Sequence, residues 1–357
     1  MRSRLRFWKY PISIVLLLLV VAAFTLVYIL SETAEAPYDH IGQPTPVIVE
    51  TPDPSDDPFD DPPTDDPIND PVEPDPDPDP DDVFVYNPAE DGFITINMED
   101  ADIHRGYLLL VNHDHEFTIP GDLDLVNIST ATTTQFRVQP DNARIARSII
   151  EPLDEMMDDF LTATNNRSVA IISAYRNRET QQRILNNYIS RMGRREALRW
   201  AAYPGHSEHH TGLAFDFGII SGGSRSTFTG TGSSAWFRRN SFNYGFILRY
   251  QQNKTHITQT ANEPWHFRFV GLPHSIIIHQ NNWCLEEYIE IIRDYTMDEP
   301  FIQEIDDVIY EIYFSASTDV PIPINSEFDI SGNNVDGFII TVVRLPFDPD
   351  NSTDFSI

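Results

Sequence analysis

The stretch PGHSEHHTGLAFDF, residues 204–217, holds the densest group of side chains that could carry out chemistry. It places three histidines within five residues, and an aspartate follows at Asp216. Imidazole nitrogen and carboxylate oxygen are common ligands of catalytic zinc, which keeps three protein ligands and an open position for water. Taken alone, the stretch also fits a histidine-rich surface loop that runs into a strand. A zinc site needs support from elsewhere in the chain.

The stretch NEPWHFRFVG, residues 262–271, supplies a second carboxylate and a further imidazole, Glu263 and His266. A carboxylate beside a zinc site can take the proton from the attacking water. The Glu–x–x–His spacing brings both groups to one side of a helix, whereas a strand points them to opposite faces. Pro264 disfavours an uninterrupted helix, so we expect a bend. The alternative is a core Trp265 flanked by surface Glu263 and His266.

The stretch ISAYRNRETQQ, residues 172–182, places a guanidinium where a predicted strand ends, at Arg176. Arginine stays charged and can hold an oxyanion or a carboxylate through two hydrogen bonds. The alternative is a surface arginine at the start of a helix.

The order and spacing of these three stretches resemble the VanY-type zinc D,D-carboxypeptidases, within the LAS group of peptidoglycan peptidases. That pattern reads S-G-Y-R, then S-x-H-x-x-G-x-A-x-D, then E-x-W-H or E-x-x-H. Ala174 stands where the pattern usually has glycine. The resemblance covers roughly residues 108–295. The matching positions are Ser173, Tyr175, Arg176, Ser207, His209, Gly212, Ala214, Asp216, Glu263, Trp265 and His266.

The resemblance implies a role for several matched residues. It makes His209, Asp216 and His266 the zinc ligands. It makes Glu263 the general base for the attacking water and Arg176 the group that steadies the tetrahedral oxyanion. Substrate contacts are implied for Ser207 and Gln181. We expect His206 and His210 to lie outside the ligand set, because a fourth protein ligand would close the water position.

The resemblance also implies the substrate, which is a peptidoglycan stem peptide ending in D-Ala-D-Ala. Hydrolysis would release the terminal D-alanine. An endopeptidase that cuts inside the stem or cross-bridge peptide is the alternative activity. A wall-binding module without catalysis is the alternative from a different functional class.

Hydrophobic periodicity predicts an α+β fold. The resemblance adds that residues 83–298 form an LAS-type peptidase domain, with a central antiparallel sheet flanked by helices. Residues 299–357 form a small β-rich extension, which either packs on the peptidase or binds the wall. The expected strands are 93–98, 106–112, 168–175, 213–220, 265–271, 308–314 and 337–343. The expected helices are 141–164 with a break at Pro152, 178–192, 195–202 and 282–295.

The N-terminus predicts a membrane anchor. Residues 1–10 carry four basic side chains, and residues 11–30 are uncharged and apolar. Twenty such residues rise about 30 Å as a helix, which is enough to cross the hydrocarbon core. The positive-inside rule leaves residues 1–10 cytoplasmic and the peptidase extracellular, in the wall region. The small-x-small sequence Ala34-Glu35-Ala36 offers the alternative of a cleaved signal.

Residues 31–82 predict a disordered stalk, because they contain many prolines and acidic residues and few apolar ones. The Asp/Pro stretch of residues 51–82 holds fourteen acidic residues, nearly half of the net charge of −31. This acidity argues against a nucleic-acid partner, which would require basic clusters. Cys284 is the only cysteine, so no internal disulfide forms, and its position predicts a buried thiol.

Overall fold

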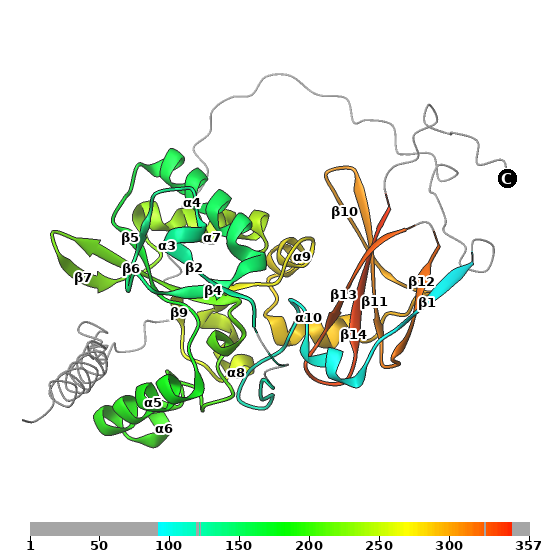
Figure 1. Ribbon diagram of the computed structural model, residues 1–357, viewed down its shortest axis with the longest axis horizontal. Coiled ribbons are helices and arrows are strands. Elements are labelled where there is room, and N and C mark those ends of the chain that lie inside the picture. Colours follow the sequence, from blue (N-terminus) through cyan, green and yellow to red (C-terminus); the bar gives the residue numbers. More distant parts are fainter. Residues whose placement is uncertain (1–91, 119–120, 122, 325, 345–357) are drawn as a thin grey trace, which may run out of the picture. The chain divides into compact units, whose positions relative to one another are not determined.

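The computed structural model describes residues 92–118, 121, 123–324 and 326–344 (Figure 1). The predicted anchor, residues 11–30, and the predicted stalk, residues 31–82, lie outside the described residues. All described residues fall within one unit of the chain, Pro46–Ile357. No helix in the described part of the chain combines the length and the apolar composition that a membrane crossing needs.

A mixed but mainly antiparallel sheet forms the centre of the peptidase region (Figure 1). Its strand order is β3-β5-β6-β9-β8, and β7 pairs with β6. Every pair is antiparallel except β3 with β5. The prediction of an α+β domain around a central antiparallel sheet is confirmed. The strands are β3 (Arg137–Val138), β5 (Val169–Ser173), β6 (Ala214–Ser221), β7 (Ser224–Thr227), β8 (Phe246–Tyr250) and β9 (Glu263–Phe269).

Side-chain alternation along β6 separates the core from the site. Successive strand residues point to opposite faces, so Phe215 and Phe217 share one face and Asp216 takes the other. Phe215 and Phe217 are buried and both contact the Phe267 ring of β9, with ring centroids 6.1 and 5.4 Å away. Burying each such ring contributes about 1.5–3 kcal/mol to stability. The same packing therefore anchors the strand and orients its aspartate.

Helix α4 (Ile150–Thr164) begins later than the predicted range 141–164. Pro152 lies in its first turn, where a missing backbone N–H costs no helical hydrogen bond. The residues before it form strand β4 (Arg144–Ala146), which pairs with β2 (Leu125–Asn127). The helix runs through Pro152 without interruption, so the predicted break there is wrong. The helical prediction is also wrong for residues 141–146, and Arg147–Ile149 form a short 3-10 helix before α4.

The remaining helices surround the sheet and its loops. Helix α5 (Arg178–Met192) has the predicted bounds, and its N-cap Asn177 accepts a hydrogen bond from the backbone N–H of Thr180. The predicted helix over 195–202 is reduced to α6 (Arg194–Ala197), and the predicted helix over 282–295 is α10 (Leu285–Ile292). The others are α3 (Ile128–Ala131), α7 (Ala235–Asn240), α8 (Thr255–Thr258) and α9 (His274–Gln280).

Residues 106–112 are not a strand, which corrects the prediction. Leu108 to Val111 are buried, but side chains rather than a neighbouring strand satisfy much of their backbone. The Arg268 guanidinium donates to the carbonyls of Tyr107 and Leu109, each at 2.9 Å. The apolar composition of residues 106–112 therefore predicted their burial correctly. It wrongly predicted a neighbouring strand as the hydrogen-bond partner of their backbone.

The β-rich C-terminal extension is present, and it includes a strand from the N-terminal end of the range predicted for the peptidase, 83–298. Four strands form a sheet in the order β10-β11-β14-β13, while β12 pairs with β1 (Phe93–Asn97). Ile312 and Ile339 of this extension join a buried cluster with Leu285 and Ile289 of α10. The extension thus packs on the peptidase. Its strands are β10 (Phe301–Ile305), β11 (Val308–Ser315), β12 (Asp319–Pro323), β13 (Glu327–Gly332) and β14 (Phe338–Arg344).

Candidate metal centre

Three elements that are distant in sequence bring His209, Asp216 and His266 together. His209 lies in the short 3-10 helix Glu208–Thr211, Asp216 in β6 and His266 in β9. One ligand atom from each residue lies within 4.8 Å of the others. Gly212, which ends the 3-10 helix, has φ 74°, and a Cβ there would lie 2.7 Å from a Leu125 methyl group. The turn that leads His209 into β6 therefore requires glycine.

Hydrogen bonds decide which nitrogen of each histidine faces the centre. His209 Nδ1 lies 2.6 Å from the carbonyl of Ala174, which can only accept, so Nδ1 donates and Nε2 keeps its lone pair. His266 Nε2 lies 3.1 Å from a carboxylate oxygen of Glu208, which leaves Nδ1 facing inward.

When both rings are neutral, the inward-facing atoms are all hydrogen-bond acceptors. His209 Nε2 lies 3.3 Å from Asp216 Oδ2, and His266 Nδ1 lies 3.0 Å from Asp216 Oδ1. Two imidazole lone pairs and a carboxylate at these distances repel one another unless a cation lies between them. The donor set of two nitrogens and one oxygen suits zinc and leaves a coordination position open. The residues therefore fit a catalytic zinc ion.

The pKa shifts agree with a cation-binding group. Burial and the nearby Arg176 lower the pKa of His209 to about 4, so its ring is neutral and able to bind metal. Burial opposes ionisation of Asp216, but His209 and His266 hold its pKa well below the usual range. Burial also lowers the pKa of His266, yet hydrogen bonds to Asp216 and Glu208 outweigh it and raise the value to about 9. A proton on His266 occupies the place that a metal ion would take.

Glu263 lies beside the ligands, at an irregular stretch in the pairing of β9 with β8. Tyr250 is opposite Glu263, and Leu248 is opposite Phe267, so β9 advances four residues where β8 advances two. The ladder is therefore irregular between Glu263 and Phe267, so the strict alternation of a regular strand does not apply across this stretch. Glu263 Oε2 lies 3.9 Å from His266 Nδ1. Burial raises the pKa of Glu263 to about 8.

Arg176 leaves the end of β5 and turns toward the same centre. Its backbone N–H donates to the carbonyl of His209 at 3.1 Å, which ties the two loops together. Burial lowers the pKa of its guanidinium, while the carboxylates of Asp216 and Glu263 raise it. Among the described residues, its buried Nε–H has no hydrogen-bond partner.

The two predicted substrate-contacting residues are both buried. Ser207 precedes the 3-10 helix of His209. Gln181 in α5 donates from Nε2 to the carbonyl of Ala202 at 2.8 Å, while its buried Oε1 has no partner within the described chain.

The two remaining histidines of the loop are engaged with backbone. His206 Nδ1 lies 2.8 Å from the carbonyl of Asn112. His210 Nδ1 lies 2.6 Å from the carbonyl of Arg176, and its Nε2 accepts from the backbone N–H of Gly205 at 3.0 Å. Neither belongs to the metal-ligating group.

Comparison with known proteins identifies the family. Residues 142–272 match the family described as VanY: D-alanyl-D-alanine carboxypeptidase. A D-alanyl-D-alanine carboxypeptidase of Enterococcus faecium is 32% identical over 249 residues, which cover 68% of this chain and 77% of that protein. The chain belongs to the VanY family.

The solved structures similar to this VanY-family chain include the following two. One is the vancomycin resistance D,D-dipeptidase VanXYg in complex with a D-Ala-D-Ala phosphinate analogue. It is 34% identical, covers 71% of this chain and 100% of its own, and has a TM-score of 0.63. The other is a mutant of the D,D-pentapeptidase VanY in complex with Zn(II). It is 31% identical, covers 51% of this chain and 98% of its own, and has a TM-score of 0.44.

The predicted enzyme class and cofactor are confirmed for this VanY-family protein. It is a zinc D-alanyl-D-alanine carboxypeptidase that acts on peptidoglycan-related peptides. The ligand group that the resemblance implied is assembled in the structure. The family match includes all three ligands as well as Arg176 and Glu263.

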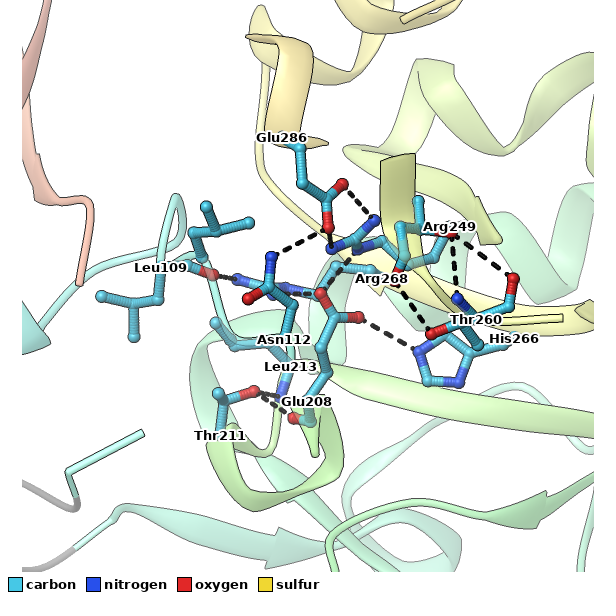
Figure 2. A network of polar contacts seen from close by, with 12 residues as sticks. Leu109, Asn112, Glu208, Thr211, Leu213, Arg249, Thr260, His266, Arg268 and Glu286 are labelled. Atoms are coloured by element: carbon cyan, nitrogen blue, oxygen red, sulfur yellow. Dashed lines mark hydrogen bonds and ion pairs between the residues drawn. The ribbon is translucent and has the colours of Figure 1, made fainter. Parts of the chain in front are cut away.

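Sequence reasoning missed a group of buried charges behind His266 in this VanY-family site. Glu208, Arg249 and Arg268 are fully buried and linked by hydrogen bonds (Figure 2). The available signal was an arginine with apolar or aromatic neighbours on both sides in each of two strands, FILRY and EPWHFRF. A buried arginine needs a buried anion nearby, and Glu208 directly precedes His209 in the chain.

Proposed function

We propose that this protein removes the terminal D-alanine from peptidoglycan stem peptides on the outer side of the cell membrane, with Glu263 as the general base. One observation carries the proposal. The ligand group of His209, Asp216 and His266 has a buried carboxylate of raised pKa beside it, and a guanidinium whose Nε–H is buried. Hydrolysis of a peptide bond requires a base and a group that stabilises negative charge.

Zinc held by these three side chains supplies Lewis acidity toward the scissile carbonyl and lowers the pKa of water. Glu263 takes a proton from the water as its oxygen bonds to the carbonyl carbon. The carbon–nitrogen bond then breaks, and Glu263 returns the proton to the departing amine of D-alanine. Its burial suits both steps, because a carboxyl with a pKa near neutrality can accept and release a proton at physiological pH.

Arg176 stabilises the negative charge that develops on the carbonyl oxygen. Its position beside Asp216 and Glu263 keeps it charged despite burial. The unpartnered Nε–H is a donor that is buried before any substrate arrives. Such a preorganised donor needs little rearrangement during the reaction.

Ser207 and Gln181 contact the peptide substrate. Gln181 Oε1 is a buried acceptor without a partner among the described residues. A buried acceptor of this kind carries a desolvation cost until it receives a hydrogen bond. An amide or amine N–H of the substrate would provide that bond.

Residues 11–30 anchor the protein in the membrane, and residues 31–82 hold the peptidase away from it. The anchor and the extracellular location rest on the apolar run and on the preceding basic residues. Cell fractionation followed by protease treatment of intact protoplasts tests both. We expect the peptidase in the membrane fraction and accessible to protease, and recovery in the cytosol would contradict the proposal.

The activity is tested with the full-length protein in detergent on a stem pentapeptide and on free D-Ala-D-Ala. We expect a product one alanine shorter from the pentapeptide, and loss of that activity after removal of zinc by a chelator. A cut within the stem would make the protein an endopeptidase instead. Cleavage of the free dipeptide alone would make it a dipeptidase.

A further inference from the structure

A fully buried carboxylate, Glu208, lies between one metal ligand and two arginines (Figure 2). Its Oε2 is 3.1 Å from His266 Nε2. Its Oε1 accepts from Arg249 Nε at 2.7 Å and from Arg268 NH1 at 2.9 Å. Glu208 thus contacts the ring nitrogen of His266 that faces away from the metal centre.

We propose that Glu208 is a positioning residue, which keeps the proton of His266 on Nε2 and so presents the Nδ1 lone pair to zinc. This inference rests on the proposed zinc site. Arginine has only donors, so Arg249 and Arg268 require Glu208 to be an acceptor. An ionised carboxylate can only accept hydrogen bonds, so the His266 ring must donate its hydrogen bond to Glu208 from Nε2. The geometry leaves Nδ1 unprotonated in the neutral ring.

The arginines are themselves held in place, so Glu208 cannot turn away from His266. Arg268 donates to the carbonyls of Tyr107, Leu109 and Phe269 within 3.0 Å. Arg249 forms two hydrogen bonds of 2.8 Å with the carboxylate of Glu286, which lies in the first turn of helix α10. Two arginines and two glutamates balance in charge. Because their charges cancel, all four side chains can remain ionised in a site that excludes water.

Glu208→Gln is the informative substitution, because it keeps the shape and reverses one hydrogen bond. The amide oxygen of glutamine must face the arginine donors, so its NH₂ group faces His266 Nε2. That nitrogen then becomes an acceptor, and the proton moves to Nδ1, where it competes with zinc. We expect zinc affinity to fall about 10- to 100-fold, as for other groups that orient metal-binding histidines.

The measurement is chelator competition for zinc, with the full-length protein in detergent and without any peptide substrate. Glu311→Gln is the matched control, because Glu311 is also buried and pairs with an arginine, Arg344 at 3.2 Å, but in the C-terminal sheet. We expect this control to bind zinc like the wild type. Equal affinities in all three proteins would overturn the proposal.

Histidine NMR on the wild type provides a test that does not depend on how the variant folds. In the zinc-loaded protein, we expect His266 to show a slowly exchanging proton on Nε2 and a metal-bound Nδ1. A proton on Nδ1 would overturn the proposal. A wild type that binds zinc without peptidase activity would contradict the proposed function and leave this test intact.

Discussion

Asp216 lies directly opposite His266 across the β6–β9 ladder, and its Oδ1 lies 3.0 Å from His266 Nδ1. The antiparallel register therefore assembles two metal ligands from residues fifty positions apart. Slipping either strand by one residue would move one of these side chains to the opposite face. The aromatic packing of Phe215, Phe217 and Phe267 resists such a slip. The core on one face of the sheet thus maintains the site on the other.

Replacing His209 with glutamine should remove zinc, because it deletes a nitrogen ligand from the centre. We expect affinity to fall by more than about 100-fold, beyond the loss typical of supporting groups. Metal content after gel filtration measures the effect. His206→Gln is the control from the same loop, because His206 lies outside the metal-ligating group and its Nδ1 lies beside the carbonyl of Asn112. Retained zinc in the His209 variant would remove that residue from the ligand set.

Replacing Glu263 with glutamine should abolish proton transfer and leave the metal bound, since Glu263 is outside the ligand group. We expect kcat on a stem pentapeptide to fall about 10²- to 10⁴-fold. Product release followed by mass spectrometry gives the rate, and metal analysis of the same sample gives zinc content. Loss of zinc in this variant would show that Glu263 binds the metal.

Replacing Arg176 with alanine should reduce kcat about 100-fold or more, because a preorganised charge is lost from the oxyanion position. Zinc should remain. Arg178→Ala is the matched control two residues away, since Arg178 is exposed and pairs with Glu116. Equal kcat values for the two variants would mean that Arg176 has no special role in catalysis.

Acid should destabilise the protein partly through His274, which links α9 to α10 and β14. Its Nδ1 lies 2.6 Å from the Tyr288 hydroxyl, and its Nε2 lies 3.1 Å from that of Thr341. Burial lowers the pKa of His274 to about 3. Between the ordinary value of about 6.5 and about 3, the unfolded chain takes up a proton that the folded chain refuses. The stability contribution is complete above about pH 6.5 and decreases as the pH falls.

His274→Gln should reduce that pH dependence by up to about 1.4 kcal/mol per pH unit. Urea unfolding at several pH values between 7 and 5 measures the slope of the free energy of unfolding for both proteins. The variant is expected to be less stable at pH 7, because glutamine packs less well there. Parallel slopes would show that His274 titrates alike in the folded and unfolded states.

The sequence alone determined the chemistry of this protein. Through the family resemblance, motif order and spacing implied the three ligands and roles for Glu263 and Arg176, and the residue pattern placed helix α5 at its observed bounds. These features depend on residue type and local spacing, which a sequence displays directly. The acidic stalk and the apolar N-terminal run are local features of the same kind, and they remain predictions.

Only the tertiary structure decided how these residues meet. Glu263 meets His266 beside a register shift between β8 and β9, although a regular strand would have pointed the two side chains to opposite faces. The arginine partners of Glu208 come from two strands, β8 and β9. The backbone carbonyls in residues 106–112 accept hydrogen bonds from side chains far along the chain, such as Arg268. Strand pairing and buried hydrogen bonds join positions that the sequence separates by tens of residues. The local sequence around a buried polar residue shows that the residue needs a hydrogen-bond partner. Only the tertiary structure shows which residue is that partner.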